Sequence, residues 1–340
     1  LIKKGGRKRV NKTSRKVGIL VALALILLLS IMIAVNMGYS SVPLKDVIKA
    51  FFGIGIPGKI IIIRQLRLPR ILVGALCGIG LALSGSVLQS VTGNALADPG
   101  ILGINAGAGI AVLLFLVFFP EMYAQSMEII PIFAFIGGLS VLVFLYTFAY
   151  RNGKLSVKFF LTGGIGMAAG INAVMLILST GLENSNFQMV SRWLVGSLWG
   201  TDWHHLKLLL LYLIVPVLFL LCYSRKIDMM LMGREVAVGL GVSVEREYRV
   251  LLFVSVWLAA ACVSVCGGVG FIGLVSPHIA KRLVGIRHCF LLPCAMMTGA
   301  LICVLGDAVG RMVITSIEIP VGIVVSVLSA PYFLDRKSVV

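Results

Sequence analysis

Residues 67–110 read RLPRILVGALCGIGLALSGSVLQSVTGNALADPGILGINAGAGI. Two glycine-rich apolar segments, each long enough to enter a bilayer, are joined in this stretch by a short polar loop from Thr92 to Pro99. Asn94 and Asp98–Pro99 are predicted to end one helix and start the next, because Asn and Asp favour helix caps and Pro suits a first helical turn. A single membrane anchor needs no such arrangement, so the stretch indicates a packed protein that crosses the membrane several times.

The composition of the chain is that of a membrane protein. Of its 340 residues, 59% are hydrophobic and 13% are charged, and the mean hydropathy is +1.05. A soluble domain of this length could not bury so much apolar surface, so the sequence predicts an all-α, polytopic membrane protein. The 30 Lys and Arg residues against 13 acidic ones suit basic cytoplasmic loops, and no mixed aromatic and basic patch indicates a nucleic-acid partner.

The apolar runs predict about ten transmembrane helices. They lie at 17–37, 71–91, 101–119, 129–150, 157–180, 205–223, 250–266, 269–284, 290–313 and 319–335. We interpret residues 1–16 as a basic cytoplasmic tail, 17–335 as a single transmembrane domain and 336–340 as a C-terminal tail. Both termini and the loop 224–249 then lie in the cytoplasm together with most of the basic residues, as the positive-inside rule requires.

Three basic residues oppose this charge bias. Arg64, Arg67 and Arg70 fall on the outer side in the topology above, so a structural or docking reason is expected for them. Asp307 is the only acidic residue well inside a predicted span, and Arg311 follows four residues later, which is the spacing of a helical ion pair. A proton- or sodium-coupled carrier would need more ionisable groups at this depth, so an ion-coupled secondary transporter is the weaker alternative.

The loop 224–249 is predicted to contain a short amphipathic helix. The helix would run from Met230 to Leu240 and end at Gly241, a residue suited to a left-handed C-cap. It is too short to span a membrane, and it is apolar on one side and charged on the other. Such a helix typically meets a partner protein or the membrane surface, and the alternative is a surface helix resting on its own spans.

Glycines spaced four residues apart predict close helix packing. The pairs are Gly74/Gly78, Gly103/Gly107, Gly166/Gly170, Gly196/Gly200 and Gly306/Gly310. The seven cysteines are scattered, mostly within apolar runs. Cys262 and Cys266 share a helix face, but without a CxxC pair or a nearby His we expect small buried hydrophobic side chains and no metal site.

Motifs that could carry catalysis are incomplete. Residues 53–59, GIGIPGK, have the glycine and lysine spacing of a phosphate-binding loop, but Ile60 occupies the Ser/Thr position that Mg²⁺ requires. Ser84 and His278 could supply a nucleophile and a base, yet the sequence around Ser84 lacks the flanking glycine pattern of a serine hydrolase. We instead place His278 at the start of a helix, with Pro277 in its first turn.

Seven sequence blocks together resemble the permease subunits of bacterial ABC importers for iron–siderophore complexes, haem and vitamin B12, the FecCD-type family. The blocks are RLPR at 67–70, NALADPGILGINAGA at 94–108, WLVGSLWGTDW at 193–203, GREVAVGLGV at 233–242, GGVGFIGLVSPHIAKRLVG at 267–285, GDAVGR at 306–311 and EIPVGIVVSVLSAPYF at 318–333. The resemblance therefore runs over nearly the whole chain.

The resemblance implies a non-catalytic, type II ABC importer permease in the bacterial inner (cytoplasmic) membrane. Two copies, or this chain and a paralogue, would form a homo- or heterodimer in the lipid around a central path. Cytoplasmic ATP-binding subunits would use ATP and Mg, an extracytoplasmic substrate-binding protein would deliver the cargo, and this chain would bind no cofactor. The cargo implied is a siderophore-type iron chelate, with haem, cobalamin or an oxyanion as the alternatives.

The resemblance also implies roles for individual residues. Docking of the binding protein falls to Arg67, Arg70 and Arg311. Coupling to the ATPase falls to Leu231, Gly233, Arg234, Glu235, Ala237, Leu240 and Gly241. Structural motif positions are Asn94, Asp98, Pro99, Gly103, Pro277, His278, Asp307 and Pro320. The chain departs from the family near Leu155–Lys158, where Val157 and Lys158 stand in place of small polar residues expected at the cytoplasmic gate.

Overall fold

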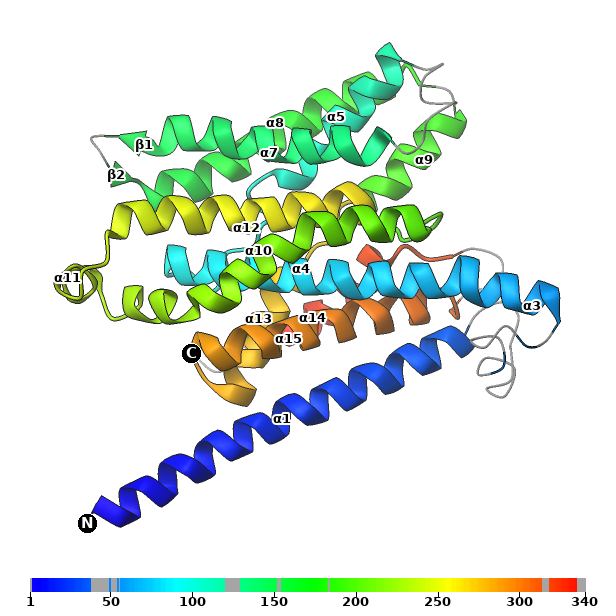
Figure 1. The fold of residues 1–340 in the computed structure, drawn as a ribbon. Coiled ribbons are helices and arrows are strands. Elements are labelled where there is room, and N and C mark those ends of the chain that lie inside the picture. The colour runs from blue at the N-terminus through cyan, green and yellow to red at the C-terminus, as the bar shows by residue number, and fades with distance from the viewer. Residues whose placement is uncertain are drawn as a thin grey trace.

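The chain folds into a bundle of helices, seen here in a computed structural model (Figure 1). The structure describes residues 2–37, 49, 54, 56–119, 129–151, 154–182, 184–313 and 318–334. The helices of at least 14 residues are α1 (Ile2–Asn36), α4 (Leu68–Thr92), α5 (Ile104–Phe118), α7 (Ile130–Ala149), α8 (Val157–Ser179), α10 (Trp203–Met230), α12 (Val244–Cys266), α14 (His288–Gly310) and α15 (Val321–Leu334). Shorter helical elements are α3 (Pro57–Ile61), the π-helical turn η1 (Ile62–Arg67), α9 (Asn184–Val195), α11 (Arg234–Gly239) and α13 (Ile272–Val284).

The prediction of an all-α membrane protein is confirmed. Within the described residues the only strands are β1 (Tyr150–Arg151) and β2 (Lys154–Leu155), an antiparallel pair between α7 and α8. In the part of the chain that the structure describes, seven helices are long and apolar enough to cross a membrane, and α5 and part of α15 are shorter apolar helices. The remaining predicted span, 269–284, corresponds to α13, which has 13 residues. The count of ten spans therefore stays a prediction.

Helix α4 lies at the centre of the bundle, with α10 and α12 on one side and α14 on the other (Figure 1). A Cβ atom on Gly78 of α4 would collide with the backbone of Gly299 in α14, so this contact requires glycine. Close packing is thus confirmed at Gly78. The prediction of close packing is wrong for Gly166 and Gly170 of α8 within the single chain, because a Cβ atom at either position would have no neighbouring atom within 4 Å.

The helix that carries the RLPR block begins earlier than predicted. We expected a span from residue 71 with its arginines at the entrance, but the helix starts at Pro57 and runs for 36 residues to Thr92. Pro69 has no N–H to donate and would crowd the carbonyl four residues before it. The preceding turn η1 widens to the π form, in which the Leu68 amide donates to Ile63, and this keeps the helix continuous.

The polar loop after α4 also differs from the prediction. Asn94 and Asp98 do not cap helices: the Asn94 Oδ1 atom accepts from the Leu96 amide at 2.9 Å, and the Asp98 Oδ1 atom accepts from the Gly100 amide at 2.8 Å. Each side chain therefore closes a local turn. Pro99 lies in the second turn, and α5 begins only at Ile104, after Gly103 with φ of +82°.

Pro277 lies in the middle of α13 rather than in its first turn, and His278 is a half-buried residue of the same helix. Because proline has no N–H, the Gly273 carbonyl one turn earlier loses its helical donor. The Gln89 Nε2 atom of α4 approaches that carbonyl at 3.3 Å, and the Gln89 Oε1 atom accepts from Lys281 Nζ at 2.9 Å. A neighbouring side chain therefore replaces the missing hydrogen bond, which is how a buried helix tolerates proline.

The two predicted tails lie at the ends of the described chain. The backbone of α1 is helical from Ile2, so residues 2–16 continue without a break into the first span. Residues 336–340 lie outside the described residues. The domain boundaries stay a prediction.

Candidate functional site

Two regions at opposite ends of the bundle contain most of the predicted site residues (Figure 1). We call the end where α11 lies the α11 end, and the opposite end, where α3 lies, the arginine end. The arginine cluster consists of Arg67, Arg70, Asp307, Arg311 and Glu318.

Asp307 is the shared acid of the arginine cluster. Its Oδ1 atom accepts from Arg70 Nε at 3.0 Å and from Arg70 Nη2 at 2.8 Å. Its Oδ2 atom lies 3.0 Å from Arg311 Nε, so the predicted helical ion pair is confirmed. The Nη1 atom of Arg70 donates to Glu318 Oε2 at 2.7 Å. A single carboxylate of α14 thus joins two arginines that come from separate helices.

Arg67 and Arg311 bind the C-terminal end of α1. Arg67 Nη1 donates to the Val35 carbonyl at 2.9 Å, and Arg311 donates to the carbonyls of Ala34 and Met37 at 3.2 and 3.0 Å. The last carbonyls of a helix have no partner within the helix, and cations stabilise that negative end of its dipole. The two arginines therefore tie α1 to the rest of the bundle.

The three predicted docking arginines differ in their exposure. Arg67 is 8% exposed, and the side chain of Arg311 is 6% exposed. Arg70 is more accessible and borders a cavity of about 230 Å³. The geometry therefore gives Arg67 and Arg311 a structural role, while the docking role of all three stays a prediction.

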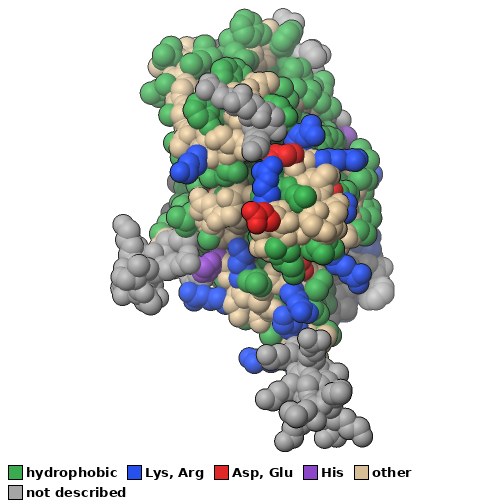
Figure 2. Space-filling model, turned by 90° about the vertical axis from the view of Figure 1, so that its left-hand side faces the viewer, with side chains coloured by type: hydrophobic (Ala, Val, Ile, Leu, Met, Phe, Trp, Pro, Cys, Tyr) green, Lys and Arg blue, Asp and Glu red, His purple; other side chains and the backbone are tan. Residues whose placement is uncertain are grey.

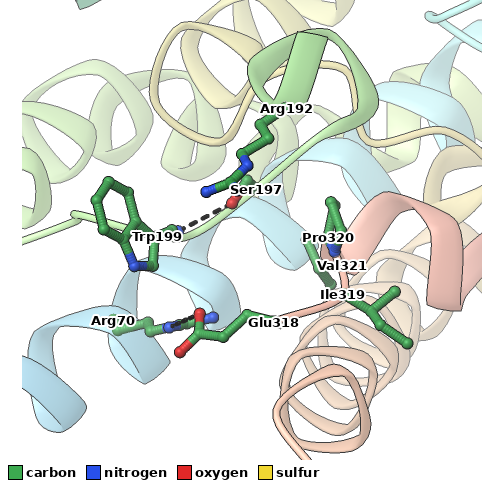
Figure 3. Close-up of a pocket in the computed structure, with 8 residues that line it drawn as sticks. All are labelled: Arg70, Arg192, Ser197, Trp199, Glu318, Ile319, Pro320 and Val321. Atoms are coloured by element: carbon green, nitrogen blue, oxygen red, sulfur yellow. Dashed lines mark hydrogen bonds and ion pairs between the residues drawn. The ribbon is translucent and has the colours of Figure 1, made fainter. Parts of the chain in front are cut away.

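The cavity beside Arg70, which we call the Trp199 crevice, is also lined by Arg192, a residue that the sequence did not single out. Its lining is Arg70, Arg192, Ser197, Trp199, Glu318, Ile319, Pro320 and Val321 (Figure 3). Arg192 of α9 enters from one side, and Arg70 with Glu318 from the other. Arg192 and Trp199 are exposed. Arginine and tryptophan are enriched where proteins bind one another, but no local pattern in the sequence distinguishes Arg192 from other surface arginines.

Helix α11 is shorter than predicted. It spans Arg234–Gly239, whereas Met230 is the last residue of α10. The break between the two helices lies at Gly233, whose φ of +104° is outside the helical region. The predicted left-handed backbone at Gly241 is confirmed, with φ of +82°.

The short helix α11 exposes apolar side chains. Ala237 is fully buried in a small cluster with Val242 and Val244, whereas Val236 and Leu240 are more than a third exposed. The other coupling residues are also exposed: Leu231, Gly233, Arg234 and Glu235. Arg234 Nη2 lies 2.7 Å from Glu245 Oε1, a solvent-exposed ion pair between the start of α11 and α12. Adjacent exposed apolar side chains on a polar loop are typical of a protein interface.

The surface around α11 is basic. Figure 2 views this end directly and shows Lys and Arg side chains spread among hydrophobic ones, with fewer acidic side chains. The exposed basic residues at this end include Arg225, Lys226, Arg234, Arg246, Arg249, Arg282 and Arg287.

A Ser–His–Asp arrangement around one buried histidine joins three helices near the α11 end. His288 Nδ1 lies 2.7 Å from Asp228 Oδ1, and His288 Nε2 lies 2.8 Å from Ser90 Oγ. His288 is only 1% exposed, and Ser90 Oγ also donates to the Ser86 carbonyl. These contacts link α4, α10 and α14, so the arrangement has a structural role. Sequence reasoning could not find it, because the three residues lie far apart along the chain.

Asp98 is a buried acid in the loop between α4 and α5. Burial raises the pKa of its carboxyl to about 6, while the hydrogen bond from the Gly100 amide acts in the opposite direction. The side chain lies against α13, since a Cβ atom on Gly273 would be 3.0 Å from Asp98 Oδ2. The position therefore favours the neutral form of the carboxyl below about pH 6.

No metal centre is formed within the part of the chain that the structure describes, because no three His, Cys, Asp or Glu residues come together there. Cys262 and Cys266 are buried in α12, and the Cys266 thiol donates to the Cys262 carbonyl at 2.9 Å.

Comparison with known proteins gives a consistent result. Residues 26–335 match the FecCD transport family. The chain is 37% identical over 328 residues to the iron(3+)-hydroxamate import system permease protein FhuG of Bacillus subtilis, covering 95% of this chain and 97% of that protein. It is 36% identical to the Fe(3+)-citrate import system permease protein YfmE of the same organism, covering 96% and 97% of the two chains. A solved structure of an inward-facing metal-chelate type ABC transporter is 29% identical and covers 93% of this chain and 97% of its own, with a TM-score of 0.81.

Proposed function

The chain belongs to the FecCD transport family, and on this premise we propose that it is the transmembrane permease subunit of an ATP-driven importer for a siderophore-type iron chelate. The observation that carries the proposal is the similarity to FhuG and YfmE over at least 95% of this chain, because those relatives import iron(3+)-hydroxamates and Fe(3+)-citrate. Haem, cobalamin and oxyanions are the competing cargoes.

We place ten spans across the bacterial inner membrane, with the α11 end and both termini in the cytoplasm. The basic surface of the α11 end supports this orientation. Helices α5 and α13, of 15 and 13 residues, are too short to cross about 30 Å by themselves. Non-helical segments before them cover the remaining depth, which is tolerated where the backbone is buried in protein. The last residues before α5 meet this condition, since Leu102 and Gly103 are buried.

A second permease, either a copy of this chain or a paralogue, would pack against α8 in the lipid. This helix is largely exposed in the single chain, and Gly166 and Gly170 form an open stripe of small residues on it. Small residues let membrane helices approach closely. The path for a bulky chelate would then run between the two permeases.

The cytoplasmic ATP-binding subunits would dock on α11. The exposed side chains of Val236 and Leu240 would provide the apolar contact, and the buried side chain of Ala237 packs the helix against Val242 and Val244. ATP and Mg are used by those subunits. Movement of α11 would reach the bundle through Asp228 of α10, which contacts His288 of α14.

The substrate-binding protein would dock at the opposite, outer end of the bundle. Of the three arginines assigned to docking, Arg70 is the best placed, because it lines the Trp199 crevice. Arg67 and Arg311 would stabilise the structure next to that surface by binding the carbonyl groups at the end of α1.

The proposal is tested by reconstituting the permease with its ATPase and binding protein in liposomes. Uptake is measured separately with radiolabelled ferric hydroxamate, ferric citrate, haem, cobalamin and molybdate. We expect uptake of a ferric chelate that requires ATP and continues after a protonophore is added. Uptake without ATP that stops when the proton gradient collapses would identify a secondary transporter, and uptake of another cargo alone would replace the iron chelate.

A further inference from the structure

Arg70 has two acidic partners that differ in burial. The side chain of Asp307 is 3% exposed and that of Glu318 is 44% exposed. Asp307 accepts two hydrogen bonds from Arg70. Glu318 contacts only the Nη1 atom of Arg70 (Figure 3). An ion pair that is half open to water is weak and is screened by salt. Asp307 is therefore a permanent partner of Arg70, and Glu318 is a partner that can be exchanged.

The Trp199 crevice has room and charge for another carboxylate. Among the described residues that line it, Glu318 is the only acidic one, and Arg70 and Arg192 are both cationic. Within the described residues Arg192 takes part in none of the ion pairs. A guanidinium group pairs with a carboxylate through two parallel hydrogen bonds. An incoming acidic side chain would therefore find one unoccupied arginine and a second whose outer partner is weakly held.

Glu318 also precedes a segment that backbone hydrogen bonds hold against two other parts of the bundle. The Ile319 amide donates to the Gly310 carbonyl at 3.1 Å, and the Gly322 amide donates to the Gly196 carbonyl at 3.2 Å. These bonds join the beginning of α15 to the end of α14 and to the loop after α9. The contact between Glu318 and Arg70 adds α4 to this junction. Separating that pair would loosen α4 from the start of α15.

We propose that Glu318 is an internal competitor for a carboxylate of the substrate-binding protein. In the absence of the partner, Glu318 occupies the outer face of Arg70. On docking, an acidic side chain of the binding protein replaces Glu318 and pairs with Arg70 and Arg192 in the Trp199 crevice. This inference rests on the proposed function, because it takes the partner to be the binding protein of the importer.

The test measures association of the substrate-loaded binding protein with the permease–ATPase complex in lipid nanodiscs at low and high salt. Glu318→Gln removes the competing charge, so we expect the dissociation constant to fall about two- to fivefold at low salt. The gain should shrink as salt rises. Arg192→Glu should weaken association, because it places a negative charge where the partner carboxylate would bind.

A matched control separates competition from overall charge. Asp202→Asn removes a carboxylate at the same end of the bundle while keeping an acceptor for the His204 amide at the start of α10. Asp202 does not line the Trp199 crevice. We therefore expect this variant to bind like the wild type.

Two results would overturn the inference while the proposed function stands. One is a wild-type complex that transports and docks normally, with Glu318→Gln binding no more tightly. The other is an equal gain from Asp202→Asn, which would assign the effect to net charge. Failure of the wild type to bind a binding protein and to import any cargo with ATP would instead reject the proposed function. Thermal midpoints of all variants confirm that folded complexes are compared.

Discussion

The arginine cluster and α11 use charged residues in opposite ways. In the arginine cluster, Asp307, Arg67 and Arg311 are turned into the bundle, where they pair with one another or with helix-end carbonyls. At α11, charged side chains face outward, and the apolar side chains of Val236 and Leu240 are exposed beside them. The first region pairs most of its charged groups within the bundle, while the second leaves apolar surface exposed. We therefore expect substitutions in the arginine cluster to act mainly on the stability of the permease, and substitutions on the exposed face of α11 to act mainly on its proposed docking to the ATPase.

The largest effect is expected from Asp307→Ala. This change leaves Arg70 and Arg311 without their shared buried carboxylate. Loss of one partner of a buried ion pair lowers the free energy of unfolding by about 3–5 kcal/mol. Glu318→Gln is the matched change at the exposed partner of Arg70 and should cost about 1 kcal/mol or less. Thermal unfolding of the purified permease measures both. Equal destabilisation by the two variants would show that burial does not separate the two acids.

A second buried acid tests what the arginines contribute. Within the described residues Asp98 takes part in none of the ion pairs, and burial raises its pKa to about 6. The folded state therefore binds this proton more tightly than the unfolded state, so the stability that protonation contributes is lost as pH rises through about 6. At pH values well above that pKa, Asp98→Asn should be more stable than the wild type by about 1–3 kcal/mol.

The same variant should lose its advantage in acid, where the wild-type carboxyl is neutral. Thermal midpoints measured across the pH range give the comparison, and Asp202→Asn is the exposed control. An advantage that is independent of pH would exclude titration of Asp98 as its cause.

At α11, Gly241→Val should impair the ATPase interface. The φ of +82° at this position costs roughly 1–2 kcal/mol for a residue with a side chain and more for a β-branched one. We expect less ATPase to co-purify with the permease and ATP-driven uptake to fall. Gly239→Ala is the control, because that residue lies in the helix with open space around it. Full ATPase content in Gly241→Val would reject the role of this turn.

The smallest effect on stability is expected from Val236→Asp. The side chain is exposed in the permease alone, so the free energy of unfolding should change by no more than about 0.5 kcal/mol. Co-purification of the ATPase should nevertheless fall, because a charge replaces apolar contact surface. Ala237→Asp, at the buried position beside it, should destabilise the permease itself. If Val236→Asp recruits the ATPase normally, the exposed face of α11 is not the interface.

Much of the fold could be predicted from local patterns. Apolar runs indicate membrane helices because the bilayer requires about 20 apolar residues per span and leaves no backbone group unpaired. The left-handed turn at Gly241 and the ion pair between Asp307 and Arg311 were predicted correctly, since each depends on residues within one or two helical turns. The helix boundary predicted from Pro277 was wrong, because a side chain of a neighbouring helix can replace the hydrogen bond that this proline removes.

The candidate site depended more on tertiary structure. From the sequence, Arg67 and Arg311 are predicted to lie on an outer surface. In the structure both side chains instead bind carbonyl groups at the end of α1. Packing also brought Arg192 to the same crevice as Arg70, although the two lie far apart along the chain.

The sequence by itself determined that this chain is a helical membrane protein of the FecCD transport family, because apolar length and local motifs carry that information. Only the tertiary structure decided which charged groups are buried and which can bind a partner. The physical reason is that a guanidinium group pairs with whichever carboxylate or free carbonyl the packing brings within about 3 Å of it, and that choice depends on helices distant in sequence.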